Sequence, residues 1–226
     1  FRSTFTLTNT YFGQWVDADL GDASDDFVGC DASRGLGFCY NGKTTDDDNP
    51  GNGSLGYGAT PPVIGVDFFE GPFADNDGID NPLTQVVADA LDSNGIPYKG
   101  LGIGYGDGII DNERYGMKKF VYYNIGGGNQ GDPNTALDYY NYLQGVWKDG
   151  SQMVWGGNGN FSTGGTVPAD LLFPGESDPL LWSTRGVTVP TSNWSEFNGA
   201  AGGGANVPGD RRFLESAGPF ILEPGA

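Results

Sequence analysis

Alternating apolar and polar side chains predict a strand at the start of the chain. Phe1, Phe5 and Leu7 are separated by threonines and Arg2 over residues 1–10, which suits a half-buried strand. A second apolar run over 11–16, interrupted by Gly13, ends at an acidic residue. Further strand patterns cover 35–40, 62–69, 118–125 and 216–225, and the run 62–69 is apolar enough to predict a buried strand.

Only two segments have a helical period. Over 82–93 the apolar residues recur at helical spacing, Asn81 is a suitable N-cap and Pro82 fits the first helical position. Over 133–147 one face carries Ala136, Tyr140, Leu143 and Trp147. Aromatic residues here, including Tyr139 and Tyr142, form either core or a platform on which sugar rings stack.

Composition agrees with a strand-dominated chain. The 226 residues include 40 glycines and 14 prolines, while 37% hydrophobic and 13% aromatic residues are enough for a packed core. We therefore expect a mainly β, β-sandwich-like, loop-rich fold with two short helices, organised as one module over 1–226. Neither a signal peptide nor an initiator methionine opens the chain, so we expect a piece of a larger multidomain protein.

The charge and the absence of histidine exclude several functions. A formal net charge of −18 repels nucleic acid phosphates and anionic lipid, and attracts divalent cations. No apolar run is long enough to cross a bilayer, so we expect no direct membrane insertion. Because the chain has no histidine, the usual zinc site of a metalloprotease and a Ser-His-Asp triad cannot form.

The stretch 17–31 carries six carboxylates among small residues. Like charges this close repel, and a bound Ca²⁺ would supply the counter-charge, since it takes oxygen ligands from flexible loops. The alternative is a solvated acidic loop. Asp67, a lone acid in the apolar run 62–69, is expected either to join this site or to pair with Arg34. The candidate ligands are Asp17, Asp19, Asp25, Asp26, Asp31 and Asp67.

Two further acidic clusters follow downstream. Both combine oxygen-bearing side chains at close spacing with a glycine turn, as calcium loops do. For the first, Asp80 could instead favour the start of the helix predicted over 82–93; for the second, a plain hairpin turn is the alternative. The candidate ligands are Asp75, Asp77 and Asp80 in the first cluster, and Asp107, Asp111 and Glu113 in the second.

Two cysteines, Cys30 and Cys39, are separated by eight residues. In an oxidising compartment they are expected to form a disulfide, and otherwise to be buried free thiols. The acidic, lysine-poor composition favours the extracellular environment and therefore the disulfide. Arg211 and Arg212 are expected to pair with carboxylates inside the fold.

Several runs resemble those of large secreted proteins of Bacteroidota, which are substrates of the type IX secretion system. They include 11–21, 25–31, 35–42, 65–72, 111–114, 139–143 and 210–214, in the same order along nearly the whole chain. The resemblance implies secretion and attachment to the outer cell surface, with other cell-surface or secretion-system proteins, or surface glycans, as partners. It carries over no catalytic residues.

Two functions remain after these exclusions. The first is a non-enzymatic structural or adhesive module of the cell surface, stabilised by calcium. The second is a carbohydrate-binding or carbohydrate-active module, in which Asp111 with Glu113, or Glu176 with Asp178, would act as acid and base. Exposed Trp155, Trp182 or Trp194 would then stack on sugar rings.

Overall fold

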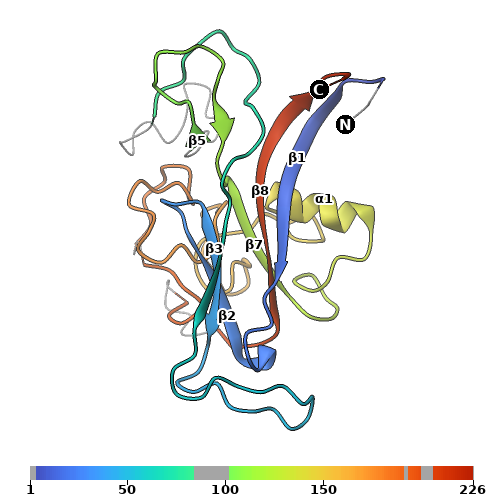
Figure 1. Cartoon of the computed structure of the whole chain (residues 1–226), viewed down its shortest axis with the longest axis vertical. Helices are drawn as coiled ribbons and strands as arrows, with labels where there is room; N and C mark the ends of the chain where they lie inside the picture. Colours follow the sequence, from blue (N-terminus) through green and yellow to red (C-terminus); the bar gives the residue numbers. More distant parts are fainter. Residues whose placement is uncertain (1–3, 84–101, 191–192, 200–205, 226) are drawn as a thin grey trace.

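The computed structural model describes residues 4–83, 102–190, 193–199 and 206–225. The described chain is mainly β, as expected, with three small antiparallel sheets and one α-helix. Figure 1 shows two long strands, β1 (Leu7–Asp17) and β8 (Arg211–Leu222), running side by side along the molecule. The helix predicted over 82–93 lies, apart from its first two residues, outside the described residues.

The central sheet has the order β1-β8-β7, with β7 spanning Lys119–Asn124. β8 pairs with both neighbours, so the two ends of the described chain meet in one sheet. β1 joins residues 7–10 of the run predicted over 1–10 to the run predicted over 11–16, with register shifts between Leu7 and Phe12. The strand predicted over 216–225 begins earlier, at Arg211.

A second sheet has the order β2-β3-β4, with bounds Asp26–Asp31, Leu36–Asn41 and Val63–Asp67. Its strand β2 was not predicted, because Asp26 and Asp31 resemble loop residues, yet Phe27 to Cys30 are buried. The prediction of a buried strand over 62–69 was wrong about burial: β4 is an edge strand and is mostly exposed. A third, two-stranded sheet joins β5 (Gly102–Ile103) to β6 (Arg114–Tyr115).

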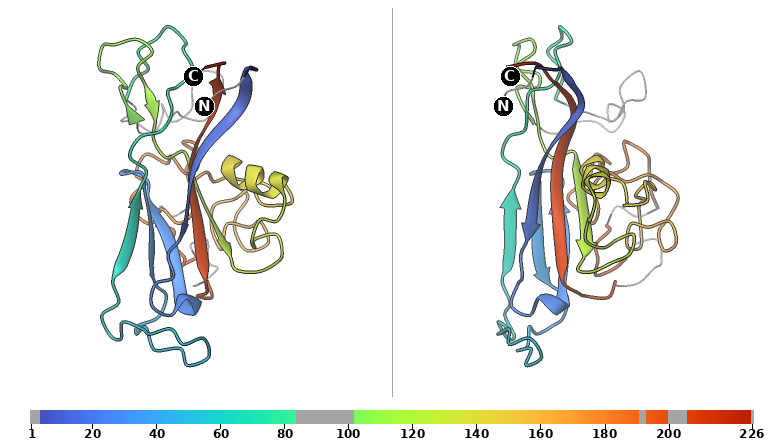
Figure 2. Two further views of the ribbon diagram at one scale, coloured as in Figure 1. Left: turned by 45° about the vertical axis from the view of Figure 1, so that its right-hand side comes forward. Right: turned by 90° about the vertical axis from the view of Figure 1, so that its right-hand side faces the viewer.

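The faces of the central sheet are covered differently. Figure 2 shows β2, β3 and β4 on one side of it and α1 (Ala136–Gln144) on the other. Phe120 and Phe213 face the β2-β3-β4 sheet, where a Cβ on Gly37 of β3 would come within 2.8 and 2.5 Å of their rings. The two sheets therefore pack closely, although the sandwich-like arrangement as a whole stays a prediction.

The helix predicted over 133–147 is present but shorter. Thr135 caps its N-terminus: the Thr135 hydroxyl accepts from the backbone N–H of Asp138, whose carboxylate accepts in return from the N–H of Thr135. Gly145, in the left-handed region, ends it. α1 lies close to β1 at Gly13, where a Cβ would sit 2.4 Å from the Leu143 side chain.

The core forms one continuous cluster of buried apolar side chains. It includes Trp147, Trp155 and Trp194 from the long loops that follow α1. The prediction that Trp155 and Trp194 could present faces to sugar rings was wrong, because both indoles are buried. Tyr142 and Trp147 also belong to the core, whereas Tyr139 is exposed.

Candidate functional site

Asp17, Asp19 and Asp210 form an acidic cluster at one end of the central sheet. Each contributes a carboxylate oxygen, and the three oxygens lie within 4.8 Å of one another. Asp17 is the last residue of β1, and Asp210 immediately precedes β8, the strand with which β1 pairs. Asp19 follows β1 with a positive φ of 43°. This is the one group of three or more such ligands within the described parts of the chain.

Arg212 supplies the positive charge nearest this acidic cluster. Its Nε lies 3.1 Å from Asp17 Oδ2, and its Nη1 lies 2.5 Å from Asp210 Oδ1. The Nε is also 4.0 Å from Asp132 Oδ1. Burial is the main cause that raises the pKa of Asp17, and Asp19 adds to it while Arg212 opposes it. One guanidinium therefore balances several carboxylates only in part.

The other acids predicted from 17–31 lie elsewhere and do not join this cluster. Asp25 is buried, and its Oδ2 lies 3.1 Å from the Lys43 ammonium. Asp31 pairs with Arg34. Asp26 is buried at the start of β2, where its carboxylate accepts from the backbone N–H of Leu20 at 3.0 Å. Because Asp26 and Asp31 stand at opposite ends of β2, the stretch cannot act as one loop around a single ion.

Burial raises the pKa of Asp26 to about 7, although the Leu20 N–H and the Cys39 thiol favour its charged form. Asp46, which the sequence did not single out, is also fully buried here; its carboxylate accepts from the N–H groups of Asp22 and Tyr57. Both oxygens of Asp46 are therefore satisfied by backbone donors, which holds the turn after β1 against the loop that follows β3.

Asp67 lies far from Asp26, with which it was predicted to share a site. It ends β4 opposite Leu36, at the Asp31 end of the sheet, so the sheet's length separates it from Asp26. Arg34 is paired with Asp31. Asp67 is exposed, which removes the expected cost of burying its charge.

The second and third acidic clusters, predicted as separate loops, lie together in the structure. Asp111 accepts from the N–H groups of Asp77 and Gly78 at 2.8 and 2.9 Å. In return, Asp80 accepts from the N–H groups of Gly106 and Gly108 at 2.9 and 2.8 Å. The two loops therefore hold each other through charge-assisted hydrogen bonds.

The remaining acids of these two clusters are also bound to the fold. Glu113 is buried and accepts from the N–H of Asn81 at 2.5 Å, and Asp107 accepts from the N–H of Ile109 at 2.8 Å. Asp75 accepts from the N–H of Ile221 at 2.7 Å, which ties the loop to β8. The oxygens of these acids accept these hydrogen bonds and do not converge on one ion position.

The predicted disulfide is not present, and both cysteines are buried free thiols. In the ladder between β2 and β3, Cys30 stands opposite Gly37 and Cys39 stands opposite Val28, so the two cysteines are not direct cross-strand partners. The Cys30 thiol instead donates to the carbonyl of Leu172 at 3.4 Å. The Cys39 thiol lies beside Asp26, and burial raises its pKa.

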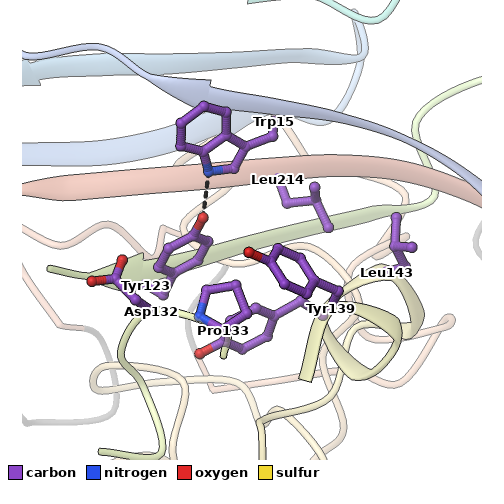
Figure 3. A pocket seen from close by; sticks show the side chains of 8 residues that line it. Trp15, Tyr123, Asp132, Pro133, Tyr139, Leu143 and Leu214 are labelled. Carbon is purple, nitrogen blue, oxygen red and sulfur yellow. Dashed lines mark hydrogen bonds between the residues drawn. The ribbon is translucent and has the colours of Figure 1, made fainter. Parts of the chain in front are cut away.

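A cavity of about 490 Å³ adjoins the acidic cluster on the α1 side of the central sheet. Figure 3 shows Trp15 from β1 above Tyr123 from β7, with Tyr139 from α1 on the opposite wall. The Trp15 indole N–H donates to the Tyr123 hydroxyl. The complete lining is Trp15, Tyr123, Asp132, Pro133, Tyr139, Tyr142, Leu143 and Leu214. We call this cavity the aromatic pocket.

The strand register explains the position of the aromatic pocket. Trp15 is the cross-strand partner of Leu214, and two residues further along the same face Asp17 is the partner of Arg212. α1 covers the preceding cross-strand pair, at Gly13, while Trp15 in the next pair is 56% exposed. The aromatic pocket and the acidic cluster therefore lie at neighbouring cross-strand pairs on one face of the sheet.

The acids proposed for glycoside hydrolysis do not form an open pair. Glu113 is buried, and buried Asp178 accepts from the N–H groups of Trp182 and Ser183 at 2.7 and 2.8 Å. Glu176 accepts from the side-chain amide of Asn193 at 3.1 Å. These carboxylates hold turns in place, which gives no support to an acid–base role.

Within the described ranges, no helix combines the length and apolar character needed to cross a bilayer. Comparison of the chain with protein-family models, with curated proteins and with solved structures found no match.

Proposed function

We propose that this chain is a calcium-stabilised structural or adhesive module of a secreted, cell-surface protein, with a sandwich-like β-rich architecture. The observation that carries the proposal is the convergence of Asp17, Asp19 and Asp210. The net charge of −18 and the resemblance to type IX secretion substrates of Bacteroidota support it.

The acidic cluster suits a hard cation in its chemistry. Calcium takes six to eight oxygen ligands, so three carboxylates would be completed by backbone carbonyls and water. A cation here would take over Asp17 and Asp210 from Arg212, with which both now pair. Because the ligands come from the end of β1 and the start of β8, binding would stabilise the strand pair that joins the two ends of the described chain.

Thermal unfolding tests this proposal. A ligand that binds only the folded state at a hundredfold excess over its Kd stabilises by about 2.7 kcal/mol, so calcium should raise the Tm and excess chelator should lower it. Asp19→Asn and Asp210→Asn should abolish the response, whereas Asp47→Asn, in an exposed loop, should retain it. Sodium chloride at matched ionic strength separates specific binding from screening. An unchanged Tm with calcium and with chelator would refute the proposal.

Carbohydrate binding remains the second hypothesis, but its specific support is reduced. Two of the three tryptophans expected to stack on sugars are core residues. The aromatic pocket presents the exposed rings of Trp15 and Tyr139.

A further inference from the structure

We propose that the aromatic pocket binds an alkylammonium group, the side chain of a lysine on a partner protein. The proposal goes beyond the calcium-stabilised module and does not require a bound ion. It rests on three properties of the pocket: the exposed faces of two aromatic rings, the excess of carboxylates beside it, and the prior pairing of several of its polar atoms.

The aromatic rings come from three elements and surround one space. Trp15 is 56% exposed and Tyr139 is 58% exposed, so both offer uncovered ring surface. Tyr123 and Tyr142 are buried and stack on each other at 5.0 Å between centroids with an interplanar angle of 10°, so the available ring faces are those of Trp15 and Tyr139. A cation over such faces is attracted by the ring quadrupoles, most strongly by tryptophan. A volume of about 490 Å³ also falls within the range of ligand sites.

The charges beside the pocket favour a cationic ligand. Asp132 lines the pocket, Asp17 lies in the adjacent cross-strand pair and Asp210 precedes β8, yet all three share the guanidinium of Arg212. Asp19 adds a fourth carboxylate. Lys148 is a second nearby cation, with its ammonium donating to the backbone carbonyl of Asp132 at 2.7 Å. The carboxylates therefore outnumber the cations, and an added ammonium would improve the balance.

Several polar atoms of the pocket are already paired, which argues against a sugar. The Trp15 indole N–H donates to Tyr123, and Asp132 Oδ2 accepts from the N–H of Gly126 at 2.7 Å. A sugar needs several directed hydrogen bonds, whereas a cation over aromatic rings needs none. The apolar side chains of Leu143 and Leu214 suit the methylene stem of lysine. Lysine fits better than arginine, because its compact ammonium does not need a bidentate partner as a planar guanidinium does.

Titration of the whole chain with short peptides tests this proposal, with chelator present so that the result does not depend on calcium. The probe is acetyl-Gly-Lys-Gly-amide, and the neutral control replaces lysine by norleucine. We expect saturable binding of the lysine peptide at millimolar concentration or below, monitored by calorimetry and tryptophan fluorescence. The norleucine peptide should bind at least about tenfold more weakly, and added salt should weaken the lysine peptide.

Variants locate the site. Trp15→Leu and Tyr139→Leu keep apolar volume but remove the ring faces, and each should weaken lysine-peptide binding, Trp15→Leu by about tenfold. Tyr57→Leu is the matched control, because Tyr57 is also 56% exposed but lies in the loop after β3. If Trp15→Leu fails to fold, Tyr139→Leu still tests the pocket, because Tyr139 lies on the exposed face of α1.

Three outcomes would overturn the proposal. The first is no binding of the lysine peptide at millimolar concentration. The second is equal binding of the lysine and norleucine peptides, which would indicate an apolar site. The third is binding of a neutral oligosaccharide such as maltotetraose, lost in Trp15→Leu, while the lysine peptide does not bind.

Discussion

Glu215 is a fully buried carboxyl group in the middle of β8, on the face that packs against the β2-β3-β4 sheet. A Cβ on Gly37 of β3 would come within 2.4 Å of its Oε1 atom. Loss of solvation raises the pKa of Glu215 to about 8, against an ordinary value of 4.5, and Asp67 adds to the shift. Glu215 is therefore predominantly protonated in the folded protein at neutral pH.

This raised pKa makes stability depend on pH. Between about pH 4.5 and pH 8 the folded state keeps a proton on Glu215 that the unfolded chain releases. The stabilisation that this proton provides is therefore complete below pH 4.5 and is lost as the pH rises through 8. We expect the free energy of unfolding to be higher at about pH 5 than at about pH 9. Glu215→Gln should remove part of that difference, as measured by urea denaturation at both pH values.

The pH dependence of Glu215 must be separated from that of Asp26, whose raised pKa of about 7 acts in the same direction. Asp26→Asn provides the comparison. The pH-dependent change in the free energy of unfolding that this variant removes should be complete at a lower pH than the change removed by Glu215→Gln. A Glu215→Gln variant with the native pH dependence would show that Glu215 is ionised in the folded state.

At the scale of elements, the absence of a side chain at Gly37 lets two sheets approach. A methyl group there would meet the carboxyl of Glu215 and the rings of Phe120 and Phe213 at 2.4 to 2.8 Å. Rings in a packed core move little, so the strands themselves would have to separate. We expect Gly37→Ala to lower the free energy of unfolding by about 1–3 kcal/mol, the usual cost of overpacking.

Gly65→Ala is the matched control for Gly37→Ala. Gly65 lies on the neighbouring strand β4, and its nearest contact would be the flexible side chain of Leu36 at 3.3 Å. Chemical denaturation of both variants should therefore show a clearly smaller loss for Gly65→Ala. Equal losses would mean that alanine at Gly37 is accommodated without separating the sheets.

At the scale of the whole molecule, 29 acidic residues against 11 basic ones make like-charge repulsion general. Because salt screens exposed charges, we expect the Tm to rise as sodium chloride is increased from about 0.01 M to about 0.5 M. Near pH 4, where many carboxylates are protonated, the rise should be smaller. A Tm that falls with salt at neutral pH would indicate that the ion pairs of Arg212 and Lys43 outweigh the repulsion.

Part of the candidate site could be predicted from the sequence. Asp17 and Asp19 were expected as ligands, and the pairing of Arg211 and Arg212 with carboxylates is confirmed, Arg211 with Glu196 and Arg212 with Asp17. Asp210 was missed, although its position directly before the two arginines was a usable signal. Trp15 was missed as a pocket residue, because its exposure depends on where α1 crosses the sheet.

Local pattern determined the predominantly β character, most strand positions and the helix between Thr135 and Gly145, because alternation, periodicity and capping act between residues close in sequence. The tertiary structure decided which acids meet. Asp17 reaches Arg212 across 195 positions only because β1 and β8 pair in one register, and the same pairing places Trp15 over the aromatic pocket. Strand register depends on contacts between distant segments, so local pattern could propose Asp17 and Asp19 but could not show that Asp210 and Arg212 join them.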